Sequence, residues 1–257
     1  MQTLRVERVL SAFRGSSWPV LVRTTSGRKL VVKLRGTAHG LLPLVAELVV
    51  GALADALGLA TPQRLLVEIG GGVASDDPHE ELVDLLRRSA GLNLGLSWLE
   101  GYRNVTLADA ERIKPELAAA IVWLDALVQN PDRSAHNTNL MIKAGQIQLI
   151  DHGAALDFHH DWRSVTEQSP REAGTVVAGH LLRVTEAQLA NADATLASKL
   201  TREVLEQALA VVPDEFLGSD AVRLRAAYVA YLWKRLKAPR PFVAMGSGRD
   251  VPFQFGR

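Results

Sequence analysis

The fold is decided by residues 130–153, which read N-P-D-R-S-A-H-N-T-N-L-M-I-K-A-G-Q-I-Q-L-I-D-H-G. The second half of this stretch predicts a β-hairpin, with strands at residues 140–142 and 147–150 and a turn at residues 143–146. Because a hairpin brings its two ends together, we expect the polar residues before it to lie beside Asp151, which directly follows it.

Two carboxylates and an amide are therefore predicted to gather at one point. Asp132 and Asn137 stand five residues apart on the polar loop, and Asp151 ends the second strand. Since carboxylates that gather without a compensating lysine repel one another, the group predicts a hard cation. Mg²⁺, completed by phosphates and water, suits such oxygen ligands. One of the carboxylates could instead serve as a base for an incoming hydroxyl.

Each of these residues also has an ordinary structural interpretation. Asn-Pro-Asp is a good turn sequence in any protein, and Asn137 or Asn139 could cap a bend. An aspartate after a strand is a common turn former or helix N-cap. The combined pattern of loop Asp, then Asn, then a hairpin ending in Asp-x-Gly is much less common than its parts, and it favours a functional site.

The composition excludes several classes of protein. The chain has 257 residues, 47% hydrophobic and 22% charged, which is typical of a soluble globular protein with one large domain or two lobes. A formal charge of +1 gives no reason to expect nucleic-acid binding, and the lack of cysteine excludes disulfides and thiolate metal sites. The longest apolar stretch, residues 41–59, is interrupted by Pro43, Glu47 and Asp55, which argues against a membrane span. With no signal peptide at the N-terminus, we expect a cytoplasmic protein.

The first third of the chain predicts β-structure with one buried ion pair. Residues 4–34 contain a hairpin, and Lys33 ends its apolar returning strand. Glu47 lies at the edge of an apolar helix face, where a carboxylate is costly to bury without a partner. An ion pair between Lys33 and Glu47 would satisfy both charges. A solvated lysine on an edge strand is the alternative.

The remaining pattern predicts two lobes, a β-rich N-lobe at residues 1–103 and a helical C-lobe at residues 104–257. The expected elements are a helix that ends at Gly58, strands at 64–69 and 94–101, a helix that opens at Pro115, a loop at 154–174 and helices within 186–211 and 219–237. His159 and His160 are interpreted as loop residues, because adjacent histidines lack the usual spacing of metal ligands.

In order and spacing, these features resemble the HipA-like serine/threonine kinases, within the protein-kinase-like and phosphatidylinositol-kinase-like fold. The residues that carry the resemblance are Val31-Val32-Lys33-Leu34, Glu47, Leu53-Ala54, Leu57-Gly58-Leu59, Asn130-Pro131-Asp132-Arg133, Asn137 and Leu149-Ile150-Asp151-His152-Gly153. The resemblance implies an α+β, bilobal fold and a short member of the family that consists of the kinase domain. The sequence departs from protein kinases in having Asp132-Arg133-Ser134 in place of His-Arg-Asp and His152 in place of the phenylalanine of Asp-Phe-Gly.

The resemblance also implies a role for each candidate residue, with ATP and Mg²⁺ as cofactors. Asp132 would orient and deprotonate the acceptor hydroxyl, while Asn137 and Asp151 would bind magnesium. Lys33 would hold the α- and β-phosphates, and Glu47 would fix Lys33.

Two further segments are expected to contact the nucleotide. A small-residue loop between strands can lay backbone N–H groups over phosphates, although a plain β-turn is the alternative. By resemblance, the phosphate loop would be Gly15, Ser16 and Ser17, and the adenine would lie against Ser97, Trp98, Leu99 and Glu100.

The expected activity is transfer of a phosphoryl group from ATP to an unidentified hydroxyl-bearing acceptor, expected to be a protein. The resemblance suggests a link to a toxin–antitoxin system and a small antitoxin-like regulatory partner, with neither nucleic acid nor membrane as a direct partner. Two other functions stay open at this point. One is a small-molecule or lipid-headgroup kinase, and the other is a non-catalytic regulator that binds nucleotide.

Overall fold

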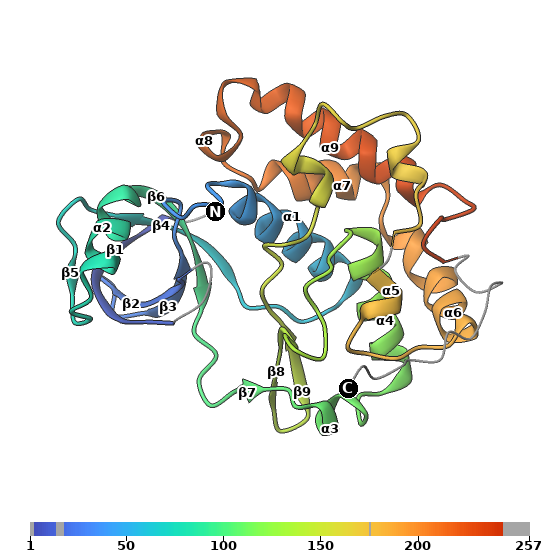
Figure 1. Ribbon diagram of the computed structural model, residues 1–257, viewed down its shortest axis with the longest axis horizontal. Coiled ribbons are helices and arrows are strands. Elements are labelled where there is room, and N and C mark those ends of the chain that lie inside the picture. The colour runs from blue at the N-terminus through green and yellow to red at the C-terminus, as the bar shows by residue number, and fades with distance from the viewer. Residues whose placement is uncertain (1–2, 14–17, 175, 244–257) are drawn as a thin grey trace, which may run out of the picture.

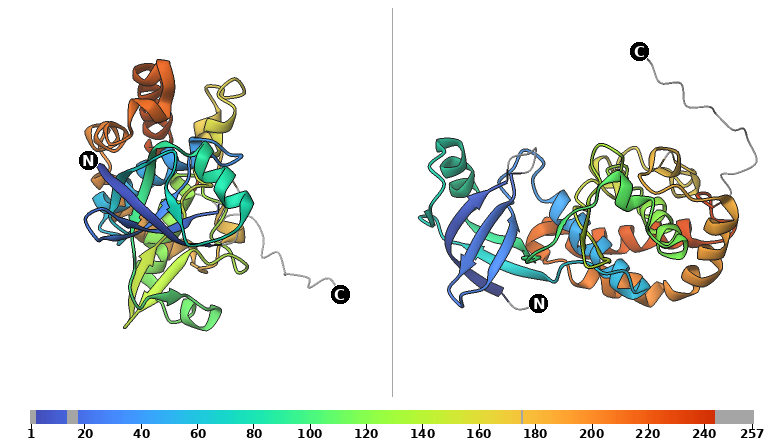
Figure 2. Two further views of the ribbon diagram at one scale, coloured as in Figure 1. Left: turned by 90° about the vertical axis from the view of Figure 1, so that its left-hand side faces the viewer. Right: turned by 90° about the horizontal axis from the view of Figure 1, so that it is seen from below.

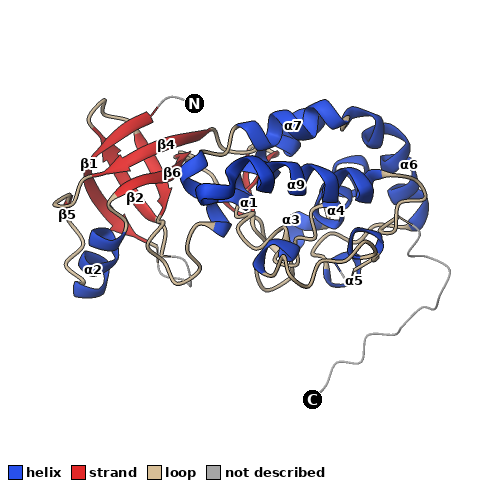
Figure 3. Cartoon of the chain, turned by 90° about the horizontal axis from the view of Figure 1, so that it is seen from above, coloured by secondary structure: helices blue, strands red, loops and turns tan. Residues whose placement is uncertain are grey.

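The computed structural model describes residues 3–13, 18–174 and 176–243. Most strands gather in one half of the molecule and most helices in the other, so the fold is α+β and bilobal, as predicted (Figure 3). The two halves lie side by side along the long axis of the molecule (Figure 2).

Five strands of the first half close into a small barrel (Figure 1). In order around the barrel these are β1 (Thr3–Ala12), β2 (Val20–Thr24), β3 (Lys29–Lys33), β6 (Gly91–Ser97) and β4 (Arg64–Ile69). All neighbours are antiparallel except β4 and β1, which pair in parallel and close the ring. The short strand β5 (Ala74–Ser75) adds to β1, and the helix α2 (Glu80–Arg88) packs its leucines against the barrel core.

Closure of the barrel depends on β1, the long first strand. β1 pairs with β4 through its first residues and with β2 through the rest, and two register shifts bend it between these partners. At Gly95 a Cβ atom would lie 2.8 Å from the Val67 side chain, so the barrel interior leaves no room there for a larger residue.

The helix α1 (Leu42–Leu57) follows the barrel hairpin but packs with the helical half. Its buried residues belong to the same apolar cluster as those of the C-terminal helices, and it contacts α7 and α8. Pro43 lies in its first turn, and Gly58 (φ 81°) caps its end in the left-handed conformation, as predicted. The predicted lobe boundary at residue 103 assigns α1 to the N-lobe, although α1 packs with the helices of the C-lobe. The lobe boundaries remain a prediction.

The helical half surrounds α4 (Pro115–Leu127), which is buried on almost every side. The other helices are α3 (Leu107–Ala110), α5 (Val176–Gly179), α6 (Glu186–Leu196), α7 (Arg202–Ala210), α8 (Asp214–Leu217) and α9 (Ala221–Leu236). Short 3₁₀ turns lie at Asp157–His160, Ser169–Arg171, Ala197–Lys199 and Gly218–Asp220. A second sheet consists of β7 (Arg103–Asn104), β8 (Leu140–Lys143) and β9 (Gln146–Leu149).

The structure corrects several predicted boundaries. The hairpin turn consists of two residues, Ala144 (φ 48°) and Gly145 (φ 81°), rather than four, because this positive-φ pair matches the twist of the strands. β6 ends at Ser97 instead of residue 101. A 3₁₀ turn and two further non-helical residues, Leu200 and Thr201, divide the helical region 186–211.

Candidate functional site

Lys33 and Glu47 form a buried ion pair between the barrel and α1. Residues alternate along β3, so Leu30 and Val32 fill the barrel while Val31 and Lys33 face the helical half. The ammonium of Lys33 contacts Glu47 Oε1, and the two residues are 7% and 2% exposed. Burial alone would lower the pKa of Lys33, but the carboxylates of Glu47 and Asp151 outweigh it, and the pKa is raised.

Asp151 joins this pair from the end of the second hairpin. Its Oδ1 lies 2.5 Å from Lys33 Nζ, and the backbone N–H of His152 donates to Glu47 Oε1 at 2.9 Å. Burial would raise the pKa of Asp151, but the Lys33 ammonium outweighs this effect and the pKa is lowered. Asp151 adopts φ 56°, a conformation that aspartate tolerates better than most residues. A Cβ atom at Gly153 would lie 3.2 Å from Pro43, so the segment approaches α1 closely because Gly153 has no side chain.

Asp132 lies on the polar loop before β8, where two asparagines hold its carboxylate. The Nδ2 of Asn137 donates to both carboxylate oxygens at 3.0 Å. The Nδ2 of Asn139 donates to the Asp132 backbone carbonyl at 2.6 Å and to Oδ2 at 3.2 Å. Asp132 is half-buried and Asn137 is exposed, so this carboxylate is oriented by hydrogen bonds and is also open to solvent.

The ends of the hairpin bring the polar loop close to the residue before Asp151. The backbone N–H of Ile150 donates to the carbonyl of Asn139 at 3.1 Å, so the polar loop ends beside the residue that precedes Asp151. Asp132 and Asn137 are in direct contact, whereas Asp151 is held by Lys33. The expectation that this group lacks a compensating lysine was wrong for Asp151, since Lys33 reaches it from the barrel through long-range folding.

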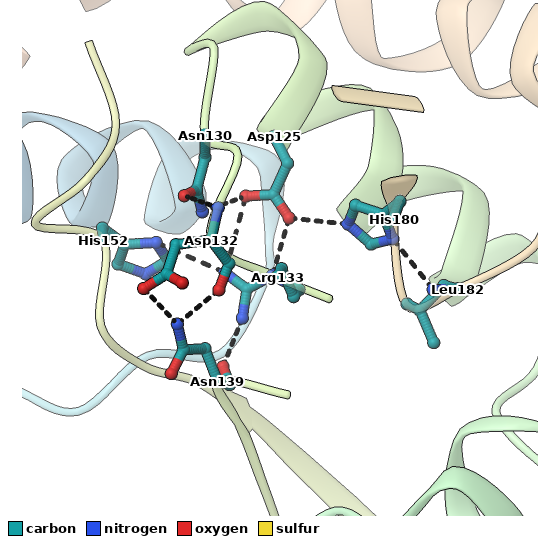
Figure 4. A network of polar contacts seen from close by, with 8 residues as sticks. All are labelled: Asp125, Asn130, Asp132, Arg133, Asn139, His152, His180 and Leu182. Carbon is teal, nitrogen blue, oxygen red and sulfur yellow. Dashed lines mark hydrogen bonds and ion pairs between the residues drawn. The ribbon is translucent and has the colours of Figure 1, made fainter. Parts of the chain in front are cut away.

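A buried polar network lies directly behind Asp132 (Figure 4). The carboxylate of Asp125, on the last turn of α4, is 0% exposed and lies 2.6 Å from Arg133 Nε and 2.9 Å from both His180 Nε2 and Asn130 Nδ2. Burial would raise the pKa of Asp125, but the Arg133 guanidinium and His180 outweigh it, so the pKa is lowered. His180 Nδ1 accepts from the Leu182 N–H at 2.9 Å, which places the ring proton on Nε2, toward Asp125.

Arg133 connects this carboxylate to the hairpin. Its guanidinium is 0% exposed, donates to the Asn139 carbonyl and lies 3.5 Å from His152 Nδ1. Asp125, Asn139 and His180 were not among the predicted site residues. A single carboxylate inside an otherwise apolar helix was the available signal for Asp125, because a buried charge requires a partner. The contribution of His180 depends on tertiary structure and left no signal in the sequence.

His152 occupies the middle of the Asp151–Gly153 segment and is 2% exposed. Burial lowers its pKa from 6.5 to about 4, and the Glu47 carboxylate offsets only part of this effect. Its Nε2 is buried without a hydrogen-bond partner among the described residues. The folded chain therefore keeps this imidazole neutral at pH values where it would be charged in the unfolded chain.

We expect stability to fall as the pH is lowered from 6.5 to about 4, because the unfolded chain then takes up a proton at His152 that the folded chain excludes. The shift corresponds to about 3 kcal/mol of unfolding free energy. In His152→Asn this contribution is absent, so urea denaturation should show a flatter dependence on pH than in the parent chain. Replacement of the exposed His39 by asparagine is the control and should leave the parent slope unchanged. An equal slope in His152→Asn and the parent would contradict the assignment.

The segment predicted to meet adenine connects the two halves. The N–H and hydroxyl of Ser97 are both engaged with the backbone of Gln63, and the N–H of Trp98 donates to the Lys29 carbonyl. The indole of Trp98 donates to Glu100 at 2.7 Å, and the Lys143 ammonium donates to the Glu100 carbonyl at 2.8 Å. These bonds fasten the connecting segment to the barrel on one side and to the β8–β9 hairpin on the other.

The remaining predicted residues have different outcomes. Gly15, Ser16 and Ser17 lie outside the described residues. His159 lies in a 3₁₀ turn, buried, with its Nδ1 at 2.9 Å from the Tyr228 hydroxyl.

The described residues lack two further features. In that part of the chain no three His, Cys, Asp or Glu side chains are grouped in a way that could hold a metal ion. No described helix combines the length and apolar character needed to span a bilayer.

Known proteins resemble this chain in sequence and in fold. Residues 6–231 match the family model described as HipA-like kinase. Among solved structures, the chain is similar to the Helicobacter pylori proinflammatory kinase CtkA, with a TM-score of 0.51 and 12% identity over 85% of this chain and 94% of that one. The structure of hydra Fam20 with sugar matches with a TM-score of 0.48 and 11% identity, over 91% of this chain and 85% of that one. No curated protein matches the sequence.

The similarity to CtkA supports the protein-kinase-like fold, and the family match extends over the barrel, α1, the polar loop and most of the helical half. By this match, the chain belongs to the HipA-like kinase family.

Proposed function

We propose that this protein is an ATP- and Mg²⁺-dependent kinase that phosphorylates a hydroxyl group of a protein. The observation that carries the proposal is the buried ammonium of Lys33, held between Glu47 and Asp151, beside a loop that presents the oriented carboxylate of Asp132. Each of these groups has a distinct task in phosphoryl transfer.

Lys33 supplies positive charge to the α- and β-phosphates of ATP. Its raised pKa keeps it protonated at physiological pH, and Glu47 holds the ammonium at the boundary between barrel and helices. Because Lys33 is buried, the attraction between its charge and a phosphate is stronger than it would be in water.

Asp132 accepts the proton of the acceptor hydroxyl. As the hydroxyl oxygen forms its bond to the γ-phosphorus, the bond from that phosphorus to the β–γ bridging oxygen breaks and ADP leaves. The proton passes to a carboxylate oxygen of Asp132. Asn137 and Asn139 fix the direction of this carboxylate, which contributes to the rate through orientation.

The donor set fits Mg²⁺. This ion is commonly bound by one or two protein carboxylate or carbonyl oxygens, together with substrate phosphates and water. Asp151 would hold it through its carboxylate and Asn137 through its amide oxygen. That oxygen is available because Asn137 uses its Nδ2, and not its oxygen, to contact Asp132. When bound, the ion supplies positive charge to the phosphate oxygens during transfer.

The nucleotide base is proposed to lie against residues 97–100. Because the N–H groups of Ser97 and Trp98 already have partners, Leu99 and Glu100 are the better candidates for contact with the adenine. The loop Gly15–Ser16–Ser17 remains the proposed cover for the phosphates.

The test combines ADP release with intact mass spectrometry, using ATP, Mg²⁺ and either a protein extract or simple alcohols as acceptor. We expect ADP release with Mg²⁺ that stops on addition of EDTA and returns when Mg²⁺ is restored. Phosphate should appear on protein rather than on alcohols. Nucleotide binding without ADP release would contradict the proposal and favour a non-catalytic regulator, whereas phosphorylation of alcohols alone would favour a small-molecule kinase.

A further inference from the structure

We infer that Asp125 and Arg133 are positioning residues that set the direction of the Asp132 carboxylate, an inference that rests on the proposed kinase function. Neither residue touches Asp132 through its charged group. Each acts through an asparagine that contacts Asp132, Asp125 through Asn130 and Arg133 through Asn139.

The first asparagine is Asn130, whose Oδ1 accepts the backbone N–H of Asp132 at 3.2 Å. Its own Nδ2 donates to Asp125 Oδ1 at 2.9 Å, so the amide cannot rotate without losing one of these bonds. Asn130 is 0% exposed and no solvent can replace a lost partner. The Asp125 carboxylate therefore fixes the start of the loop.

The second asparagine is Asn139, whose Nδ2 donates to both the carbonyl and the carboxylate of Asp132. Its carbonyl accepts a hydrogen bond from Arg133 Nη1, which holds its backbone at φ 46°. Asparagine tolerates this region better than most residues, and the bond from Arg133 restrains it further. The Arg133 guanidinium therefore fixes the end of the loop, and the same group bonds to Asp125.

The network continues beyond the loop on two sides. Arg133 Nη2 lies 3.5 Å from His152 Nδ1, and the backbone N–H of His152 donates to Glu47. On the other side, the Arg133 carbonyl accepts the N–H of Leu181 at 2.8 Å, and His180 bonds to Asp125. One buried ion pair thus links the loop that carries Asp132, the segment that carries Asp151, and the chain near residue 181.

Stability alone does not account for this arrangement. A buried ion pair is weak evidence for stabilisation, because apolar side chains of similar volume often replace it at little cost. Arg133 instead directs its three nitrogens to separate segments, and a planar fork does this where an apolar side chain cannot.

The test is the double variant Asp125→Leu/Arg133→Met, which removes both charges together and leaves neither unpaired. We expect it to fold, with a KM for ATP within about threefold of the parent and a kcat for ADP release from Mg-ATP lowered about a hundredfold, as loss of alignment predicts. When Asp132→Asn is added, kcat should fall only to the level of Asp132→Asn alone and not by the product of the two losses, because both changes act through the same carboxylate.

The matched control is the ion pair of Asp193 with Arg240, also largely buried and near α4. Asp193→Asn/Arg240→Met keeps an acceptor for the Trp123 indole and should retain the parent kcat. If the Asp125/Arg133 double variant fails to fold, Arg133→Lys tests the positioning role instead. It keeps the charge beside Asp125 but cannot reach three segments, so kcat should again fall while the KM for ATP holds.

A parent-like kcat in either the folded double variant or Arg133→Lys would overturn this inference and leave the proposed function standing. Additive losses on combination with Asp132→Asn would overturn it as well. A parent chain that releases no ADP from Mg-ATP would overturn the proposed function first, and this inference with it.

Discussion

Asp132→Asn is expected to lower the rate of phosphoryl transfer by about three orders of magnitude, within the range for loss of a general base. Asparagine has the same shape as aspartate, and its Oδ1 can still accept from one of the two neighbouring asparagines. The variant should therefore fold and bind ATP with unchanged affinity. Single-turnover ADP release and equilibrium binding of ATP measure the two quantities separately.

The control for this substitution is Asp76→Asn on the barrel, where the exposed carboxylate pairs with Arg8. Surface ion pairs of this kind contribute little to stability, so both activity and fold should match the parent. A loss of ATP affinity in Asp132→Asn equal to its loss of rate would count against a role in proton transfer, since it would indicate a binding defect.

Lys33→Met is expected to destabilise the fold by about 3 kcal/mol or more, because it leaves the Glu47 carboxylate buried without its cation. Glu47 would keep only the backbone N–H of His152 as a partner in this group. Urea denaturation at neutral pH would show the loss as a lower midpoint. The same variant should release no ADP, since the positive charge proposed to hold the phosphates is gone.

The double variant Lys33→Met/Glu47→Leu separates charge from packing. With both charges removed, the chain should recover much of the stability lost by the single variant while remaining inactive. A double variant less stable than the single one would show that shape at this position, rather than the unpaired charge, determines the loss.

Local elements of the fold could be predicted where their signals are short-range. The hairpin after Asn139, the cap at Gly58 and the strand at Arg64–Ile69 follow from turn residues, glycine and alternation. Closure of the barrel could not be predicted, because the parallel pairing of β1 with β4 joins residues about sixty positions apart in the chain. The packing of α1 with the helical half also lacks a local signal, since a helix buried on nearly all sides does not indicate its neighbours.

The candidate site also combines contacts that could be predicted from the sequence with one that could not. Asp132 with Asn137, and Lys33 with Glu47, could be paired from spacing and from the cost of burying a lone charge. The contact of Lys33 with Asp151 joins residues 118 positions apart and appears only once the barrel docks on the helices.

The packing of α1 places the two partners of the Lys33–Glu47 ion pair in different parts of the molecule. Glu47 belongs to the core of the helical half, whereas Lys33 belongs to the barrel, and their ion pair crosses the border between two separately packed bodies. A tilt of the barrel would separate the ammonium from Glu47 and Asp151 in a single movement, while α1 stays seated among its helices. The orientation of the barrel on the helices therefore determines whether Lys33 keeps both of its carboxylate partners.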